Sequence, residues 1–309
     1  PSPRLEEQMN IATRSAWSLA ALLTLAGCSD STGPKSNQTL ALSFSGLEPL
    51  LNGYHYEAWA LVGGQALPAG KFNVSSTGSL VTVSGAAIPN GEIDTGVNLS
   101  GTTAIVITIE PAGDTDAIPA ATHVVAGTVS GGTAALTVGA PQALGNAFTS
   151  AAGQYILATP TNGNGNNELS GIWFLSLASG APAVGLSLPT LPSGWVYEGW
   201  AVIGGKPVTT GRFTAVNAAD QAAPFSGSMG APLFPGEDFL VNAPAGLTFP
   251  TTLAGGTAVI SIEPQPDDSP APFALKPLVG AILATALDHV TYSLGNNAAG
   301  FPTGTATIR

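Results

Sequence analysis

Apolar and polar residues alternate along short segments of the chain, and this alternation predicts strands. In residues 104–111, Ile105, Ile107 and Ile109 alternate with Val, Thr and Glu, and residues 258–264 repeat the pattern. A period of two, β-branched side chains and a closing proline are typical of a strand with one buried face. We expect the isoleucine side of the first segment, and its counterpart in the second, to face a core.

Two further segments predict β-hairpins. Residues 56–72 read YEAWALVGGQALPAGKF, and residues 197–213 read YEGWAVIGGKPVTTGRF. Because glycine adopts positive φ without steric cost, each Gly-Gly pair suits a tight turn between two strands. Each hairpin carries an acidic and a basic residue at matching places, and we expect the cross-strand ion pairs Glu57–Lys71 and Glu198–Arg212. On an exposed surface such a pair contributes about 0.2–1 kcal/mol.

Short runs rich in β-branched and aromatic residues supply the remaining expected strands. In the first half of the chain they are residues 39–45, 80–85, 122–129, 134–138 and 154–160. Their partners in the second half are residues 171–177, 224–229, 278–283, 289–294 and 304–309. Many short strands between closely spaced turn residues favour an antiparallel sandwich over a parallel sheet.

The two halves carry the same motifs in the same order. When Gly53 is set against Gly194, the hairpin phrases align without a gap, and further on Glu110-Pro111 meets Glu263-Pro264. Two copies indicate a domain duplication, because solenoids and propellers need more units of shorter period. We therefore predict an all-β chain with two tandem Ig-like, antiparallel β-sandwich domains that follow a lipoprotein signal peptide.

The predicted boundaries follow the repeat and the local composition. Repeat 1 is expected to span residues 38–160, and repeat 2 residues 169–309. Residues 161–168 are rich in Gly and Asn without hydrophobic periodicity, which predicts a flexible linker. A phosphate-binding loop there is disfavoured, because the segment lacks a third glycine and a following Lys-Ser or Lys-Thr. Residues 28–37 are expected to be a polar tether, and residues 1–27 the signal segment with upstream residues before Met9.

The signal segment contains the single cysteine of the chain. Arg14 precedes an apolar run over residues 16–26, which is shorter than the roughly 20 residues that span a bilayer. Leu25-Ala26-Gly27-Cys28 resembles the lipobox of bacterial lipoproteins. That resemblance implies acylation of Cys28, with enough acyl chains for stable anchoring. Ser29 follows instead of the aspartate that retains lipoproteins in the inner membrane, so we expect an outer-membrane lipoprotein, or otherwise one on another extracytoplasmic membrane surface; a buried structural cysteine is the alternative.

Charge and cysteine content exclude several classes of partner and bond. The net charge is −11, with eight Lys plus Arg scattered along the chain. Without a basic stripe the chain is not suited to bind nucleic acid or to adhere electrostatically to anionic lipid. One cysteine allows no intrachain disulfide, so packing has to hold the fold.

With these motifs in view, both halves resemble the extracytoplasmic C-terminal domain of bacterial anti-sigma-K factors. The resemblance lies in a Leu- and Pro-rich lead, Tyr-x-x-Trp, the glycine turn, Gly-x-Phe, and the strand that ends in Glu-Pro before a Pro-containing loop, as in residues 46–72 with 106–127 and 187–213 with 259–280. It implies a β-sandwich outside a membrane, associated with envelope signalling. Complete anti-sigma factors add a cytoplasmic domain, often with a His/Cys zinc cluster, and a transmembrane helix. We expect neither here, and hence no direct contact with a sigma factor.

Reactive constellations are not evident in the sequence. His55, His123 and His289 do not correspond between the repeats and lack metal-ligand spacing, so we expect them on strands or the surface, with no metal and no cofactor. No Gly-x-Ser-x-Gly elbow is present. Glu110 and Glu263 are expected to cap turns rather than to act in catalysis.

Two sets of residues keep a binding interpretation open. The carboxylates Asp114 and Asp116, and Asp267 and Asp268, share one loop in each repeat; calcium is conceivable, but a solvated turn is favoured because too few oxygen ligands are present. Aromatic side chains on the hairpins are either core residues or the lining of a binding groove. The candidate motif residues are Tyr56, Trp59, Tyr197, Trp200, Glu110 and Glu263.

The functional prediction is a non-enzymatic, lipid-anchored envelope protein. Its duplicated anti-sigma-K-like domains would bind another envelope protein or a small ligand in envelope signalling, and Cys28 would hold it to the lipid bilayer. A structural or adhesive surface lipoprotein is the alternative, and a hydrolase is less favoured.

Overall fold

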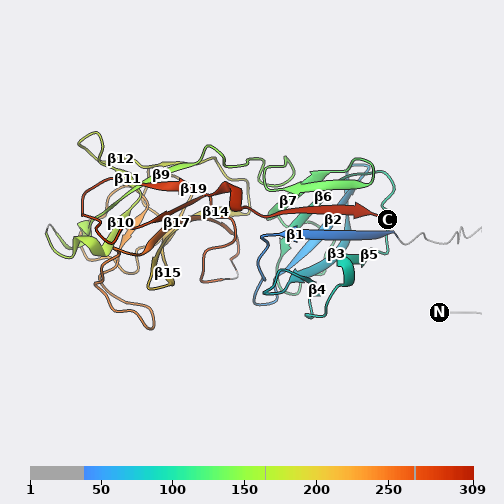
Figure 1. The fold of residues 1–309 in the computed structure, drawn as a ribbon, viewed down its shortest axis with the longest axis horizontal. Coiled ribbons are helices and arrows are strands. Elements are labelled where there is room, and N and C mark those ends of the chain that lie inside the picture. Colours follow the sequence, from blue (N-terminus) through green and yellow to red (C-terminus); the bar gives the residue numbers. More distant parts are fainter. Residues whose placement is uncertain (1–37, 164, 268) are drawn as a thin grey trace, which may run out of the picture. The chain divides into compact units, whose positions relative to one another are not determined.

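The structure is a computed structural model that describes residues 38–163, 165–267 and 269–309. The signal segment with Cys28, the tether up to residue 37, and Asp268 lie outside the described residues. The described residues, from 38 onward, belong to one compact unit. Its described part is all-β with curled antiparallel sheets, which confirms the predicted fold class (Figure 1).

Two nine-stranded sheets make up the fold, and we call them lobe 1 and lobe 2. In order across the sheet, lobe 1 contains β4 (Leu80–Val81), β3 (Gln65–Val74), β2 (His55–Val62), β6 (Thr102–Glu110), β7 (His123–Thr128), β8 (Thr133–Thr137), β20 (Thr303–Ile308), β1 (Thr39–Ser45) and β5 (Glu92–Asp94). Lobe 2 contains β15 (Lys206–Phe213), β14 (Trp195–Ile203), β17 (Thr257–Pro264), β18 (Leu278–Ala281), β19 (Tyr292–Asn296), β9 (Ala152–Leu157), β10 (Gly171–Trp173) and β16 (Gly236–Asp238), with β13 (Leu186–Ser187) beside β9. The strands β11 (Leu175–Ser176) and β12 (Ala183–Val184) pair separately. Single 3₁₀ turns lie at η1 (Pro89–Gly91), η2 (Pro160–Asn162), η3 (Glu168–Ser170) and η4 (Ala298–Gly300).

Both predicted hairpins are present with the same register. The glycine pairs at residues 63–64 and 204–205 all have positive φ, between 57° and 84°. This geometry explains why the turns carry glycine, since a side chain there would be strained. Glu57 lies opposite Lys71 on β2–β3, and Glu198 lies opposite Arg212 on β14–β15. Both hairpins shift register at the same place, between Ala58 and Trp59 and at the matching position in lobe 2.

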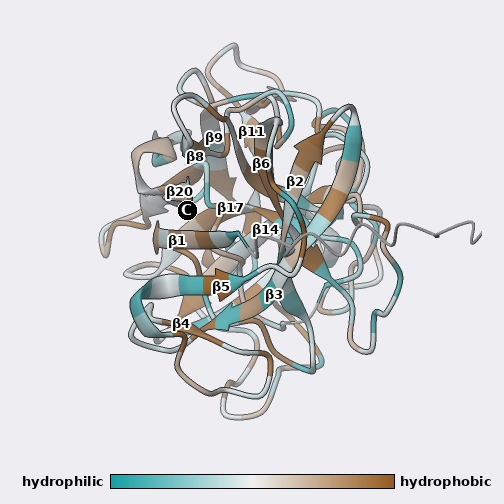
Figure 2. Cartoon of the chain, turned by 90° about the vertical axis from the view of Figure 1, so that its right-hand side faces the viewer, coloured by the Kyte–Doolittle hydropathy of each residue, from teal (hydrophilic) through white to brown (hydrophobic). Residues whose placement is uncertain are grey.

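The sheet of lobe 1 curls until strands near its two edges meet. Gly70 on β3 has φ of 135°, and a Cβ atom built there would lie 2.5 Å from the side chain of Ile93 on β5. Glycine is required at this position because β5 leaves no room for a side chain. Figure 2 looks toward lobe 1 and shows its strands wrapped around a common interior.

The strand order shows that the two repeats exchange their last strands. Matched at the hairpins, the two sheets place β20 of lobe 1 and β9 of lobe 2 at the same position. β9 comes from repeat 1 but pairs with β19, β10 and β13 in lobe 2. β20 comes from repeat 2 but lies between β1 and β8 in lobe 1. The expectation that residues 154–160 belong with the first set of strands and 304–309 with the second is therefore wrong.

Strand pairing in lobe 2 accompanies this exchange. β9 and β10 are joined by residues 158–170 and pair as antiparallel neighbours. Once β9 is taken up in lobe 2, the matching place in lobe 1 is filled by the end of the chain, where Thr39 and Arg309 exchange two backbone hydrogen bonds. The residues expected to link two domains, 161–168, thus connect two strands of one lobe. The sheets do not follow the boundaries 38–160 and 169–309.

The central strand of lobe 1 is buried on both faces, which corrects the expectation of one buried face. The isoleucines of β6 are buried as predicted, but Val106 and Thr108 on the opposite face are only 3% and 0% exposed. Val106 packs with Trp59 in a second hydrophobic cluster, and Ala140 and Ala143 pack against that cluster. The chain beyond β8 therefore covers a face that the alternating pattern had assigned to solvent.

Another expected strand does not form. Residues 224–229 are an irregular loop, because their polar groups are used elsewhere than in a sheet. Ser226 Oγ donates a hydrogen bond to Glu237, and Phe225 packs on Phe239 with ring centroids 5.8 Å apart. The loop lies over the short strand β16 instead of extending the sheet.

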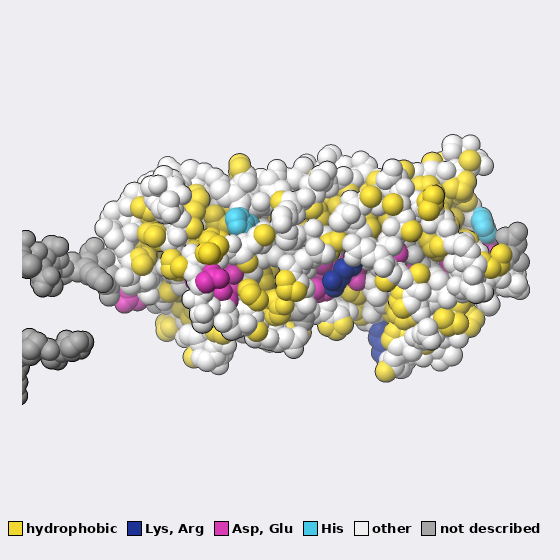
Figure 3. Space-filling model, turned by 180° about the vertical axis from the view of Figure 1, so that it is seen from behind, with side chains coloured by type: hydrophobic (Ala, Val, Ile, Leu, Met, Phe, Trp, Pro, Cys, Tyr) yellow, Lys and Arg dark blue, Asp and Glu magenta, His cyan; other side chains and the backbone are white. Residues whose placement is uncertain are grey.

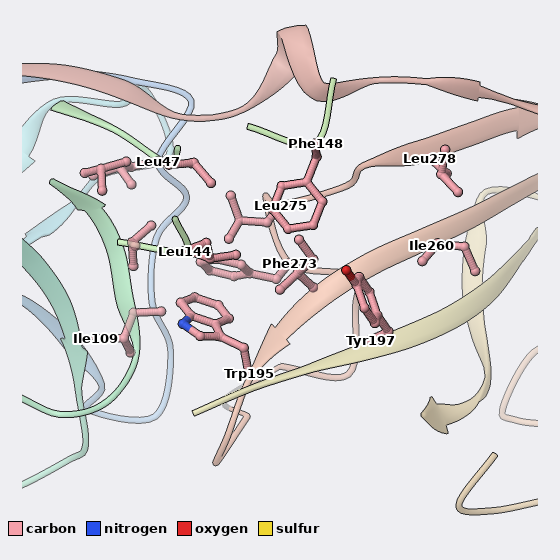
Figure 4. Packing of buried hydrophobic residues seen from close by; sticks show 14 of the residues in the cluster. Leu47, Ile109, Leu144, Phe148, Trp195, Tyr197, Ile260, Phe273, Leu275 and Leu278 are labelled. Carbon is pink, nitrogen blue, oxygen red and sulfur yellow. The ribbon is translucent and has the colours of Figure 1, made fainter. Parts of the chain in front are cut away.

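The interiors of the two lobes are continuous. One cluster of buried hydrophobic residues includes Ile109 and Leu144 of the first half and Trp195 and Phe273 of the second. Figure 4 shows these side chains packed against one another. The described residues of both lobes thus contribute to one buried cluster.

Candidate functional site

A buried hydrogen-bond chain connects the motif tryptophan and glutamate of lobe 1. Trp59 Nε1 donates to Thr108 Oγ1 at 2.8 Å, and Thr108 Oγ1 in turn donates to Glu110. Glu110 Oε1 also accepts the backbone N–H of Ala120 at 3.0 Å, ten residues further on. The carboxylate therefore fastens the loop that follows β6 to the sheet.

Lobe 2 repeats the arrangement with serine in place of threonine. Trp200 Nε1 donates to Ser261 Oγ at 2.7 Å, Ser261 donates to Glu263, and the N–H of Phe273 reaches Glu263 Oε1 at 2.9 Å. Burial raises the pKa of Glu263 to about 8. Because the carboxyl group of Glu263 is buried and bound to the N–H of Phe273, it has no contact with solvent, and its role in this geometry is structural.

The two motif tyrosines also hold loops. Tyr56 OH donates to the carbonyl of Glu48 at 2.9 Å, and Tyr197 OH donates to the carbonyl of Pro189 at 2.6 Å. Both rings are at most 2% exposed and stack on the phenylalanine of their Gly-x-Phe motif. In each repeat, the motif tyrosine therefore connects the hairpin to the segment that precedes it through a hydrogen bond to a backbone carbonyl.

Each lobe carries one basic side chain between two carboxylates. In lobe 1, Lys71 Nζ lies 3.5 Å from Glu57 Oε2 and 3.0 Å from Asp114 Oδ2. In lobe 2, Arg212 Nε lies 2.9 Å from Glu198 Oε2, and its Nη2 lies 2.5 Å from Asp267 Oδ2. The expected cross-strand ion pairs are confirmed. Glu57 and Glu198 are buried and Asp114 and Asp267 are half-buried, so the charges of the two glutamates in particular need these partners.

The two carboxylates beside Lys71 respond to it differently. Burial raises the pKa of Glu57 to about 7, although Lys71 opposes that shift. The hydrogen bond from Lys71 lowers the pKa of Asp114. The distances explain this difference, because Lys71 is closer to Asp114 and Glu57 is only 2% exposed.

His55 adds a third kind of group to the cluster in lobe 1. It lies on β2 two residues before Glu57, is 3% exposed, and its Nε2 has no hydrogen-bond partner among the described residues. Ligand atoms of His55, Glu57 and Asp114 all lie within 4.8 Å of one another. Sequence reasoning missed this grouping because Asp114 is brought to β2 by the loop after β6. In lobe 2, Val196 has the place of His55, since it faces Glu263 on β17 as His55 faces Glu110 on β6.

The loop aspartates form turns and ion pairs. Asp116 Oδ1 accepts the N–H of Ile118 at 2.8 Å, and Asp267 Oδ1 accepts the N–H of Ser269 at 2.9 Å. Asp114 is bound to Lys71. The bonds of Asp116 and Asp267 to the N–H groups two residues further on are those of Asx-turns. They leave the oxygens turned toward protein donors.

The other two histidines lie where the sequence placed them, on a strand or on the surface. His123 is in β7 and its Nδ1 lies 2.7 Å from the carbonyl oxygen of Gln142. His289 is exposed, with Nδ1 2.9 Å from Asp288 Oδ1. Neither belongs to a cluster of possible metal ligands among the described residues.

A pocket of about 250 Å³ lies beside the ion pairs of lobe 2. Trp200 contributes to its wall, so one of the candidate motif residues reaches a cavity. The remaining lining residues include Glu198, Arg212 and Asp267 together with Thr209, Phe225 and Pro270. All three charged groups are already paired with one another, which leaves little free charge for a ligand.

A wider pocket of about 740 Å³ lies in lobe 2 at the loop that joins β9 and β10. Its lining combines uncharged polar and apolar side chains: Thr161, Asn162, Asn167, Ser226, Gly227, Ser228, Met229, Leu240, Val241 and Pro250. No residue in this lining is charged. On the face of the molecule seen in Figure 3, charged side chains are few.

Two adjacent carboxylates of β16 hold the walls of this pocket. Asp238 is fully buried and accepts hydrogen bonds from Thr161 N at 2.8 Å, from Thr161 Oγ1, and from Trp173 Nε1 at 2.8 Å. Glu237 is fully buried and accepts from Ser226 Oγ. Burial raises the pKa of Glu237 to about 7 and raises that of Asp238 as well.

Sequence reasoning missed this pocket altogether. Residues 161–168 were expected to be a flexible linker, yet Thr161 is 1% exposed and Glu168 accepts the N–H groups of Thr159 and Gly165. One signal was available, since Glu237 and Asp238 are adjacent acids before an apolar residue in a chain with few charges. Their partners lie far away in sequence, so their role could not be read locally.

Comparisons with known proteins add no relatives. No protein-family model, no curated protein and no solved structure matches the chain. Within the described residues, no helix has the length and apolar character needed to cross a membrane.

Proposed function

We propose that the chain is an exported, lipid-anchored binding protein without catalytic activity, and that the wide pocket of lobe 2 receives an uncharged peptide segment of another envelope protein. The observation that carries this proposal is the pocket of about 740 Å³ whose walls are fixed by two fully buried carboxylates. Burying two adjacent acids costs free energy. We take this cost as a sign that fixing the pocket walls through their hydrogen bonds serves the function of the protein.

The lining chemistry favours a peptide. The side-chain amide of Asn167 both donates and accepts, which matches the N–H and C=O groups of a backbone. Met229 is 56% exposed at the pocket and offers an adaptable apolar contact for a side chain. A lining without charge disfavours strongly charged ligands.

In this proposal, lobe 1 is next to the membrane anchor and lobe 2 binds the ligand. In lobe 1 the ends of the described chain, Thr39 and Arg309, pair at the place where lobe 2 has the loop that forms the pocket. The proposed anchor at Cys28 would therefore lead into lobe 1, and lobe 2 would be left for the ligand. A part in envelope signalling, through domains related to those of anti-sigma-K factors and without contact to a sigma factor, remains part of the proposal and is supported by the repeated motifs alone.

Binding of uncharged and charged decapeptides to the full chain, followed by fluorescence anisotropy, tests the pocket. We expect uncharged peptides to bind, and Met229→Glu to weaken their binding by at least about tenfold, because it places a charge at the pocket. Ile118→Glu is the matched control, since Ile118 is 71% exposed in the loop after β6 of lobe 1. Equal binding by the two variants, or equal affinity for charged peptides, would refute the proposed site. A Cys28→Ser chain that still fractionates with membranes would refute the anchor.

A further inference from the structure

The cluster around His55 in lobe 1 differs from its counterpart in lobe 2 by two residues. Glu57 and Asp114 correspond to Glu198 and Asp267, but lobe 1 has a histidine and a lysine where lobe 2 has Val196 and Arg212. Arg212 reaches both of its carboxylates through separate nitrogen atoms. Lys71 brings one ammonium group to both, and leaves Glu57 Oε2 at 3.5 Å without a hydrogen bond among the described residues.

The imidazole of His55 is arranged as it is in metal sites. Its Nδ1 lies 3.4 Å from the carbonyl oxygen of Gly53, and its Nε2 is buried without a hydrogen-bond partner among the described residues. When Nδ1–H faces a backbone carbonyl, Nε2 carries the free lone pair, and this is the usual orientation of a histidine that ligates a metal ion. A buried nitrogen acceptor without a hydrogen-bond donor lowers the stability of the folded protein, so its presence calls for an explanation such as a bound ligand.

From these observations we infer that His55, Glu57 and Asp114 form a binding site for a divalent transition-metal cation such as Zn²⁺. One imidazole nitrogen and two carboxylate oxygens match the three protein ligands that zinc takes when a further position stays open to water. The three ligand atoms already lie within 4.8 Å of one another. Ligand atoms around tetrahedral zinc are roughly 3.3 Å apart, so closure needs a shift of about 1.5 Å at most.

Lys71 occupies the place of the cation when no metal is bound. Its side chain is 32% exposed, so the ammonium group can turn into solvent without burying an unpaired charge. A divalent ion brings twice the charge to the two carboxylates and also satisfies the nitrogen of His55, which an ammonium group cannot do. Lys71 is therefore a competitor for the site, and lobe 2, with a fixed arginine and no histidine, does not form one.

Calorimetric titration of the full chain with Zn²⁺, and separately with Ca²⁺, tests the site. We expect one Zn²⁺ to bind, and His55→Val, which installs the lobe 2 residue, to weaken Zn²⁺ binding by more than about 100-fold, beyond the effect usual for residues that only support a ligand. Lys71→Gln is expected to strengthen Zn²⁺ binding by removing the competing charge. Val196→His is the matched control: it adds a histidine beside Glu198 while Arg212 stays in place, and it is expected to create no second site.

Unchanged Zn²⁺ affinity in His55→Val would overturn the inference, as would weaker binding in Lys71→Gln. Binding of Ca²⁺ as tight as that of Zn²⁺ would also overturn it, because calcium is held by oxygen ligands and does not need His55. A second measurement uses the wild-type chain alone, so it does not require that any variant folds. Imidazole ¹⁵N shifts of the wild-type chain should change at His55 on addition of Zn²⁺, with His123 and His289 as internal references; an unchanged His55 signal would contradict the site.

Discussion

Lobe 1 and lobe 2 share a strand order and a repeated hairpin, but they differ at one matching pair of strands. In lobe 2 a loop connects these two strands, and in lobe 1 no loop of the described chain connects them. Where β9 passes into β10 in lobe 2, the connecting residues include Thr161, which Asp238 holds by hydrogen bonds. At the matching place in lobe 1, β20 and β1 are the ends of the described chain. In lobe 2 the loop between β9 and β10 therefore lines a pocket, whereas in lobe 1 the C-terminal strand β20 completes the sheet.

The comparison also shows how one motif supports two local chemistries. The Trp–Thr/Ser–Glu chain is nearly the same in both lobes and fixes the loop after the central strand. The charged groups beside this chain, on the same face of the sheet, diverge instead, with Lys71 and His55 in lobe 1 against Arg212 and Val196 in lobe 2. The hydrogen-bond chain is kept, whereas the side chains next to it differ between the lobes.

Deletion of residues 302–309 is expected to have the largest effect. It removes β20, with the buried Ala306, from between β1 and β8 and leaves one edge of each of these strands unpaired, so lobe 1 should unfold while lobe 2 keeps all its strands. Hydrogen exchange with mass spectrometry measures this directly. Amides of β1 and β8 should lose protection, and those of β14 and β17 should keep it. Equal loss in both lobes would show that the shared core, not the exchanged strand, sets the cooperative unit.

Asp238→Ala is expected to destabilise lobe 2 by about 2–4 kcal/mol, because it leaves buried donors of Thr161 and Trp173 without an acceptor. Asp94→Ala is the matched control: Asp94 faces Thr39 on β1 as Asp238 faces Gly171 on β10, but its side chain is exposed. Its effect should stay within about 0.5 kcal/mol. Denaturant unfolding measures both, and similar losses in the two variants would contradict the role given to Asp238.

The pH dependence of stability should show a smaller effect from Glu263. Its pKa is raised from the model-compound value of 4.5 to about 8 in the folded protein, so the folded state holds a proton that the unfolded chain releases. The contribution to stability is therefore fully present below pH 4.5 and is lost as the pH rises through about 8, with a slope of at most about 1.4 kcal/mol per pH unit.

Unfolding free energies measured from pH 4 to 9 test this sign. Glu263→Gln keeps a hydrogen-bonding side chain without a titrating proton, and should flatten the decline over that range. A wild-type chain that gains stability between pH 5 and pH 8, with the gain abolished in Glu263→Gln, would mean that the carboxylate is ionised in the fold.

Much of the local structure could be read from the sequence, and the reasons are local too. Period-two isoleucines predicted β6 and β17, and the Gly-Gly pairs predicted the turns at residues 63–64 and 204–205. The charge pairs Glu57–Lys71 and Glu198–Arg212 followed from hairpin register. Errors arose where burial depends on distant chain, as at Val106, which residues after β8 cover, and at residues 224–229, whose polar groups serve β16.

The sequence by itself determined the all-β class, the duplication and the strands that alternation and turn residues mark, because these depend on neighbours within a few positions. The tertiary structure alone decided which lobe receives β9 and which receives β20. The two strands are equivalent in their repeats, so their side-chain patterns suit either sheet, and the choice depends on pairing with strands distant in the sequence: β9 pairs with β19, and β20 pairs with β1 and β8. It also decided that His55, Glu57 and Asp114 meet, since only the path of the loop after β6 brings the third group to the other two.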